Sequence, residues 1–168
     1  MTVAARVPRQ PGRTRKAKSF RYTIDASVFV NAFNPHEKGH AESLQILASI
    51  QERGDPIIVP ALLVPEIASA VARASGDGTG ALQYADATAA VPHLTLMTLT
   101  PAMARQAAEL AATHRLRGAD AVYLAVARRY GTTMVSRDDE QRTRGSGVAT
   151  CQTPEEALIA SIEPRARR

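Results

Sequence analysis

The sequence predicts a single α/β domain built around a mostly parallel sheet. Short apolar runs alternate with longer stretches of helical periodicity, which is the pattern of strands joined by helical crossovers. Of the 168 residues, 45% are hydrophobic but only 4% are aromatic, a composition that favours helices packed through small side chains. This length supports one hydrophobic core, and no internal repeat divides the chain.

Five strands are expected, because five apolar runs are bounded by Gly, Pro or charged residues. They cover residues 21–24, 57–59, 94–99, 133–135 and 147–151. The helices expected between them would return the chain to the same edge of the sheet each time, so a mostly parallel arrangement follows.

Five helices are expected from the apolar periodicity and from the residues that begin and end them. The first runs from residue 39 or 41 to residue 52 and ends at the sequence Gly-Asp-Pro of residues 54–56. The second begins near residue 63, because Pro65 is tolerated only in a first turn, and ends near residue 74. The remaining three cover residues 79–90, 101–114 and 119–130, and Thr100 is the candidate N-cap of the fourth.

Charge is distributed unevenly along the chain. Residues 1–21 contain seven Lys or Arg and no acid, and residues 164–168 add three Arg. The overall net charge of +5 therefore belongs to the ends. We expect a basic, disordered arm over residues 1–20, one domain over residues 21–158 and a basic tail over residues 159–168. Such segments bind phosphate nonspecifically or serve only as solubilising tails.

The cysteine count and the hydropathy indicate the compartment. The only cysteine, Cys151, cannot form an internal disulfide, which favours a reducing, cytoplasmic setting. The basic N-terminus is not followed by the apolar stretch of a secretory signal, and the apolar region 57–64 is too short to span a bilayer. We therefore expect a cytoplasmic protein with no membrane partner.

Four acidic residues stand at the edges of the predicted elements. Asp25 and Asp138 follow strands, whereas Glu66 and Asp120 lie at the start of helices. The carboxyl ends of parallel strands and the neighbouring helix N-termini meet at one edge of a sheet, and the helix dipole favours negative charge there. We therefore expect the four carboxylates to share one cleft.

Clustered carboxylates repel one another in a low-dielectric interior, so they require either a cation or raised pKa values. Hard oxygen ligands favour Mg²⁺ or Mn²⁺. An ion of this kind, held by carboxylates without Cys or His, activates water for phosphodiester hydrolysis. Each acid taken singly is more often a cap or turn residue, and only the four together indicate a metal site.

Two other sets of residues have alternative readings. His36 and His40 have a metal-ligand spacing, but Pro35 and Gly39 argue against a shared helix, so both are expected to be solvated loop residues. Five arginines flank the acids. Two explanations fit them equally well, namely binding of RNA phosphates and surface ion pairs with the nearby acids. The five arginines are Arg115, Arg117, Arg137, Arg142 and Arg144.

Residues 22–30, 60–68, 116–127 and 134–140 contain these acids, and in order and spacing they resemble the PIN domain family. The resemblance spans residues 22–156 and is strongest to the VapC-type ribonuclease toxins of prokaryotic toxin-antitoxin pairs. It implies a PIN-like α/β/α sandwich and a Mg²⁺- or Mn²⁺-dependent endoribonuclease with RNA as substrate. It also implies a homodimer and inhibition by a small cognate antitoxin protein.

The resemblance assigns roles to individual residues. Asp25, Glu66, Asp120 and Asp138 match the acids that hold metal and activate water. Ser27 and Ser136 match hydroxyls that hydrogen-bond a carboxylate or a metal-bound water. Because residues 138–140 are consecutive acids, Glu140 is the reserve candidate for the last ligand.

An antitoxin helix carrying Arg would dock on the acidic cleft and on an exposed apolar groove, which we expect on the helices after Glu66 and Gly78.

Three alternative functions are weighed. A phosphotransferase with an aspartyl nucleophile requires a second Asp two residues after the first, where this chain has Ser27. A receiver domain requires a late Lys, and no Lys follows Lys38. The non-enzymatic alternative is a PIN-fold module that binds RNA or protein without cleavage, and the presence of all four acids argues against it.

Overall fold

The computed structural model describes residues 20–162. Apart from Phe20, the predicted basic arm lies outside the described residues, as do the last six residues of the predicted tail. Within the described range, five parallel strands form one sheet in the order β3-β2-β1-β4-β5. The strands are β1 (Tyr22–Ile24), β2 (Ile57–Pro60), β3 (Leu94–Met97), β4 (Thr133–Val135) and β5 (Cys151–Gln152).

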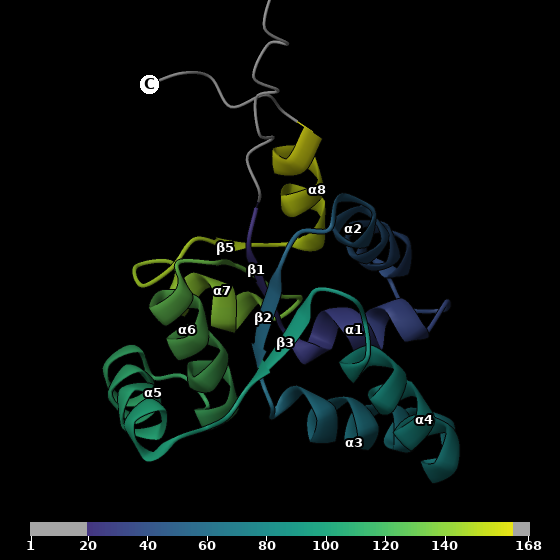
Figure 1. The fold of residues 1–168 in the computed structure, drawn as a ribbon. Coiled ribbons are helices and arrows are strands. Elements are labelled where there is room, and N and C mark those ends of the chain that lie inside the picture. The colour runs from purple at the N-terminus through teal and green to yellow at the C-terminus, as the bar shows by residue number, and fades with distance from the viewer. Residues whose placement is uncertain (1–19, 163–168) are drawn as a thin grey trace, which may run out of the picture.

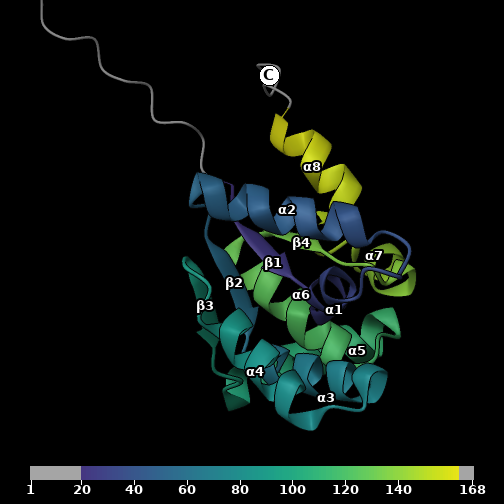
Figure 2. The same cartoon turned by 90° about the vertical axis from the view of Figure 1, so that its right-hand side faces the viewer.

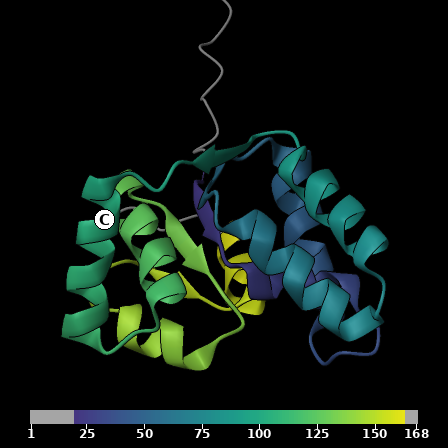
Figure 3. The same ribbon diagram turned by 90° about the horizontal axis from the view of Figure 1, so that it is seen from below.

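Helices cover both faces of this sheet. Helices α1 to α4 lie on one side and helices α5 and α6 on the other (Figure 1), and the view from below shows the same two groups (Figure 3). The described part of the chain contains α1 (Ala26–Phe33), α2 (His40–Arg53), α3 (Leu63–Ser75), α4 (Gly78–Ala89), α5 (Pro101–His114), α6 (Gly118–Tyr130), α7 (Asp139–Gly145) and α8 (Pro154–Ile162). The predicted α/β/α sandwich with a parallel sheet is confirmed.

The central strand β1 determines where the acidic residues lie. It pairs with β2 on one side and with β4 on the other, and the register aligns Ile24 with Val135. The backbone N–H of Asp25 continues this ladder by donating to the carbonyl of Val135 at 2.9 Å. The chain therefore leaves β1 and β4 at the same edge, where Asp25 and Asp138 follow.

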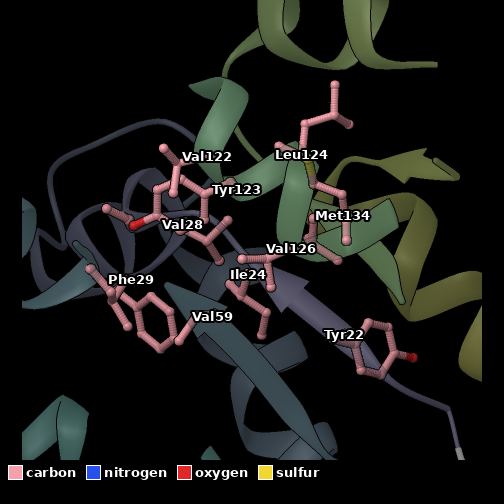
Figure 4. Packing of buried hydrophobic residues seen from close by; sticks show 14 of the residues in the cluster. Tyr22, Ile24, Val28, Phe29, Val59, Val122, Tyr123, Leu124, Val126 and Met134 are labelled. Atoms are coloured by element: carbon pink, nitrogen blue, oxygen red, sulfur yellow. The ribbon is translucent and has the colours of Figure 1, made fainter. Parts of the chain in front are cut away.

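Helix α6 forms the centre of the core. All residues from Ala121 to Ala127 are buried, as expected for a helix that is apolar on every side. Figure 4 shows Tyr123 and Val126 of α6 above the sheet residues Ile24 and Val59. Full burial stabilises each such large side chain by roughly 1.5–3 kcal/mol. Because α6 is fixed along its length, Asp120 in its first turn is held at the sheet edge.

Helix α8 packs beside α2 at the other end of the molecule (Figure 2). It continues to Ile162 and so extends past residue 158, where the sequence placed the end of the domain. Among the described residues, none of the helices combines the length and the apolar character needed to cross a membrane.

Three of the observed helices are absent from the predicted set, namely α1, α7 and α8. In α1, Val28, Phe29 and Val30 are residues typical of strands, and the helix forms because its apolar face is buried and Asp25 caps its first turn. The side chain of Asp138 caps α7 in the same way, by accepting from the backbone N–H of Gln141.

Two predicted strands are wrong in extent. The strand expected at 94–99 ends at Met97, because the following residues lead into the Thr100 cap of α5. The strand expected at 147–151 is only Cys151–Gln152, because a turn closed by a hydrogen bond from the N–H of Val148 to the carbonyl of Gly145 occupies the preceding residues.

Candidate active site

One cavity of about 370 Å³ at the carboxyl edge of the sheet brings the four predicted acids together. This edge faces the viewer in Figure 3, with α6 on one side and α3 on the other. Asp25 and Asp138 are the N-caps of α1 and α7, and Glu66 and Asp120 lie in the first turns of α3 and α6. Four helix N-termini therefore present carboxylates to the same space, and their dipoles partly offset the repulsion between them.

Asp25 is the most enclosed of the four, with 8% of its surface exposed. Its Oδ2 accepts from the backbone N–H of Ser27 at 2.9 Å, and Gln141 Nε2 lies 3.4 Å from its Oδ1. Burial raises the pKa of the Asp25 carboxyl, the hydrogen bonds from Ser27 and Gln141 lower it in part, and the negative charge of Asp138 raises it. The protein therefore imposes an electrostatic cost on Asp25 when it is ionised.

Glu66 is oriented by a buried tyrosine. The Tyr123 hydroxyl donates to Glu66 Oε2 at 2.7 Å. Burial raises the pKa of Glu66, the hydrogen bond from Tyr123 lowers it in part, and the charges of Asp25 and Asp120 raise it. Burial also raises the pKa of Tyr123, followed by the charge of Glu66, so the phenol stays neutral and acts as a donor. Tyr123 follows Asp120 by three residues, a helical spacing from which its position could have been inferred.

Asp120 and Asp138 share an arginine. Arg117 Nε donates to Asp120 Oδ2 at 3.1 Å, and its Nη2 donates to Asp138 Oδ2. Burial raises the pKa of Asp120, the adjacent Arg117 lowers it in part, and the charges of Asp25 and Asp138 raise it again. Arg117 is thus the nearest positive charge to two of the four carboxylates.

The two predicted serines contact the loop after β4. Ser27 Oγ accepts from the backbone N–H of Arg137 at 3.1 Å, and Ser136 Oγ accepts from the backbone N–H of Asp138 at 3.0 Å. The two hydroxyl oxygens lie 3.5 Å apart. Ser27 also hydrogen-bonds Asp25, whereas Ser136 fixes the backbone of the residue that carries the Asp138 carboxylate.

The PIN domain family matches residues 22–145, a span that contains all four acids. The chain belongs to the PIN domain family. No similar protein is found among curated sequences.

Solved structures share this PIN fold. VapC20 of Mycobacterium tuberculosis, described as a sarcin-ricin loop cleaving toxin, is 20% identical to this chain, with a TM-score of 0.63. The match covers 74% of this chain and 95% of VapC20. VapBC2 of Rickettsia felis, bound to promoter DNA, is 13% identical with a TM-score of 0.60 over 80% and 98%. FitAcB of Neisseria gonorrhoeae is 20% identical with a TM-score of 0.59 over 80% and 98%. These likenesses show the fold.

Other candidate residues are not brought to the cavity of this PIN domain. Glu140 pairs with Arg144 Nη1 at 2.5 Å on the exposed side of α7 and is not among the residues lining the cavity. His40 opens α2, where its Nδ1 lies 3.1 Å from the carbonyl oxygen of Asn31, and His36 lies in the preceding loop. Neither histidine lines the cavity.

Of the five predicted arginines, Arg117 alone lines the cavity among the described residues. Arg137 is held by Glu155 Oε1 at 2.6 Å, and Arg142 donates to the carbonyl of Ser136 at 2.7 Å. Arg73 of α3 lines the cavity as well, and the sequence analysis missed it. Its position seven residues after Glu66, two helical turns away on the same face of α3, is the signal that could have found it.

Gln141 is a second residue that the sequence analysis missed. Its side chain is fully buried, and besides Asp25 its Nε2 approaches the carbonyl oxygen of Asp120 at 3.5 Å. Within residues 20–162, its Oε1 has no hydrogen-bond partner. A buried amide beside Asp25 limits the positions that the Asp25 carboxylate can take. Nothing in the residue spacing of α7 indicates that Gln141 would lie there.

The donor set fits a hard divalent cation. Four carboxylates and no Cys or His line the cavity, which matches the oxygen ligands of Mg²⁺ and Mn²⁺. The raised pKa values of Asp25, Glu66 and Asp120 are the electrostatic cost that a cation would relieve. As the side chains stand, no three His, Cys, Asp or Glu residues in the described part of the chain are arranged to hold a metal ion.

Proposed function

We propose that this PIN domain is a Mg²⁺- or Mn²⁺-dependent endoribonuclease, the toxin of a toxin-antitoxin pair. The observation that carries the proposal is the convergence of Asp25, Glu66, Asp120 and Asp138, from four separate helix starts, on one cavity. Burial raises the pKa of three of these carboxyls, which is characteristic of functional sites rather than of ordinary helix caps.

In this proposal Asp25, Asp120, Asp138 and Glu66 would hold the cation. When bound, the cation would supply an activated water and would stabilise charge on the phosphate and on the leaving oxygen. The Tyr123 hydroxyl donates to one oxygen of Glu66, its Oε2, and so orients the carboxylate. Ser27 and Ser136 fix the loop that carries Asp138, so that the carboxylates from β1 and β4 keep their separation.

RNA as substrate and an antitoxin as partner are proposed from the resemblance and from the structures that share the fold. One of those is described as a toxin that cleaves the sarcin-ricin loop, and others are VapBC and FitAB assemblies. We propose that the protein is a cytoplasmic homodimer and that a small cognate antitoxin protein inhibits its activity. An apolar cavity of about 200 Å³ lies between α1, α2 and α4 and is lined by Phe29, Leu47 and Tyr84 among others. It supports α4 as part of an apolar docking groove, but no residue of α3, the other helix expected there, lines it.

A PIN-fold module that binds RNA or protein without cleaving is the second candidate. The ion pairs of Arg117 with Asp120 and Asp138 favour it, because they satisfy two carboxylates without a metal ion. A divalent-ion titration with labelled RNA separates the two functions.

We expect endonucleolytic cleavage that requires Mg²⁺ or Mn²⁺, disappears in Asp25→Asn and persists in the matched control Asp86→Asn. Asp86 is an exposed residue of α4 outside the cavity, so the control makes the same chemical change elsewhere. RNA binding without cleavage, in both the unmodified protein and Asp25→Asn, would leave the binding module as the function.

A further inference from the structure

Arg117 places a cation on the wall of the acidic cavity. Its guanidinium connects Asp120 in the first turn of α6 to Asp138, the N-cap of α7. The side chain is 67% exposed, and although Arg117 is the N-cap residue of α6 it makes no side-chain capping bond. Its fixed partners are therefore the two carboxylates rather than the backbone of its own helix.

The two oxygens that Arg117 contacts, Asp120 Oδ2 and Asp138 Oδ2, belong to carboxylates proposed as metal ligands. A guanidinium donates hydrogen bonds to the same lone pairs that a divalent cation coordinates, so the two compete for them. Arg117 therefore occupies oxygens of two carboxylates that a cation would use.

The guanidinium retains donors for a second ligand. Arginine has five N–H groups, of which Arg117 directs the one on Nε and one on Nη2 to carboxylates. None of the described residues accepts from its Nη1. A planar guanidinium binds phosphate through two parallel hydrogen bonds, and an exposed one does so without a large desolvation cost.

The second cation of the cavity, Arg73, donates to a side chain that lines the same cavity. Arg73 Nη1 donates to Ser69 Oγ at 2.9 Å, on the α3 side of the cavity. A phosphodiester that approaches four carboxylates is repelled unless positive charge lies beside them. Among the described cavity residues, Arg117 provides that charge next to Asp120 and Asp138.

We propose that Arg117 is an exchangeable phosphate ligand. In the metal-free protein it pairs with Asp120 and Asp138 and offsets one of their two negative charges. When these carboxylates hold a cation, Arg117 would bind a backbone phosphate of the RNA at the cavity mouth. This proposal rests on the proposed nuclease function, because it assumes that a cation and RNA occupy the same cavity.

The first test measures Mn²⁺ alone, by electron paramagnetic resonance of the free ion, with the full chain. Arg117→Gln removes the competing guanidinium, so we expect it to bind Mn²⁺ at least threefold more tightly than the unmodified protein. Arg128→Gln is the matched control, since Arg128 is exposed near the other end of α6 and the charge change is identical. Unchanged or weaker Mn²⁺ binding by Arg117→Gln would overturn the exchange.

The second test measures RNA affinity by stopped-flow fluorescence anisotropy, which records binding before cleavage, with all four cavity carboxylates intact and with Mn²⁺ either saturating or removed by EDTA. In saturating Mn²⁺ we expect Arg117→Gln to weaken RNA binding about tenfold and to lower the salt slope by about one, as for one lost phosphate contact. In EDTA the loss should be under twofold, because Arg117 is then paired with Asp120 and Asp138. Equal effects in both conditions, or none, would contradict a phosphate role gated by the cation.

Arg117→Lys provides a second variant that retains the charge but not the planar fork, and its RNA affinity in Mn²⁺ should fall between those of the other two proteins. Failure of this inference is distinguishable from failure of the proposed function. If the unmodified protein binds Mn²⁺ and RNA but cleaves nothing, the nuclease proposal fails and the two binding tests still decide the role of Arg117. If it cleaves RNA and Arg117→Gln changes neither affinity, only the role of Arg117 is wrong.

Discussion

Tyr123→Phe isolates the contribution of one hydrogen bond to the acidic cavity. The substitution removes only the hydroxyl that donates to Glu66 Oε2 at 2.7 Å, and the ring remains to fill the core. A hydrogen bond to a charged group contributes about 1.5–3 kcal/mol when buried. Because Glu66 is half-buried and water can replace part of the lost bond, we expect the free energy of unfolding to fall by about 0.5–1.5 kcal/mol.

Tyr84→Phe is the matched control for this change. The Tyr84 hydroxyl donates to the carbonyl of Phe29, also at 2.7 Å, outside the acidic cavity. Urea denaturation should therefore show a comparable loss of stability for both variants. Only Tyr123→Phe should lose RNA cleavage, by roughly tenfold, because Glu66 is then free to rotate and its pKa rises further without the phenol.

The pH dependence adds a second measurement on the same pair. Without the Tyr123 hydroxyl, ionisation of Glu66 is less favourable, so the acidic limb of the cleavage profile should move to higher pH in Tyr123→Phe and remain in place in Tyr84→Phe. Cleavage by Tyr123→Phe that matches Tyr84→Phe at every pH would refute the inference that Tyr123 orients Glu66.

Further predictions concern stability. Because the folded-state pKa values of Asp25, Glu66 and Asp120 are raised, their stabilising contribution is fully present below the unfolded carboxyl value of about 4 and is lost as pH rises through the folded values. The thermal midpoint in EDTA should therefore decrease as pH rises from about 4 through the folded-state pKa values. Saturating Mn²⁺ should reverse this decrease at neutral pH. A midpoint that rises steadily with pH in EDTA would contradict the raised pKa values of the three carboxyls. Gln141→Leu removes an unpaired Oε1 but also the Nε2 that donates to the buried Asp25, so calorimetry should show a loss of about 1–3 kcal/mol, whereas unchanged stability would mean that this hydrogen bond contributes nothing. Gly145→Ala should lower the free energy of unfolding by about 1–3 kcal/mol, because the added Cβ would lie 3.0 Å from Leu124 Cδ1. Gly147→Ala, which has open space around its Cβ, is the control and should lower it by less than about 1 kcal/mol. Equal thermal midpoints for the two variants would show that α7 shifts freely.

The sequence was sufficient to predict the sheet and the acids because both depend on local pattern. An apolar run that ends in Asp25 or in Asp138 marks the end of a buried strand, and a parallel sheet places such ends at one edge. Glu66 and Asp120 were identified in the same way, as acids at the first turns of apolar helices. These residues required no knowledge of which helix face contacts which neighbour.

The remaining features depend on packing that single-sequence patterns do not encode. Gln141 reaches Asp25 only because α7 packs with one particular rotation. Helix α1 was missed because Val28 and Phe29 favour strands locally, and burial of its apolar face overrides that preference. The pairing of Arg117 with both Asp120 and Asp138 joins positions 21 residues apart, so the sequence identified the arginine but not its partners.

Anomalous diffraction from crystals grown with Mn²⁺ tests the central claim most directly. The account predicts a Mn²⁺ peak inside the acidic cavity, coordinated by Asp25 together with Asp120 or Asp138, with the Arg117 guanidinium turned away from the coordinated oxygens. A cavity without a peak at saturating Mn²⁺, and with Arg117 still joined to both carboxylates, would contradict it.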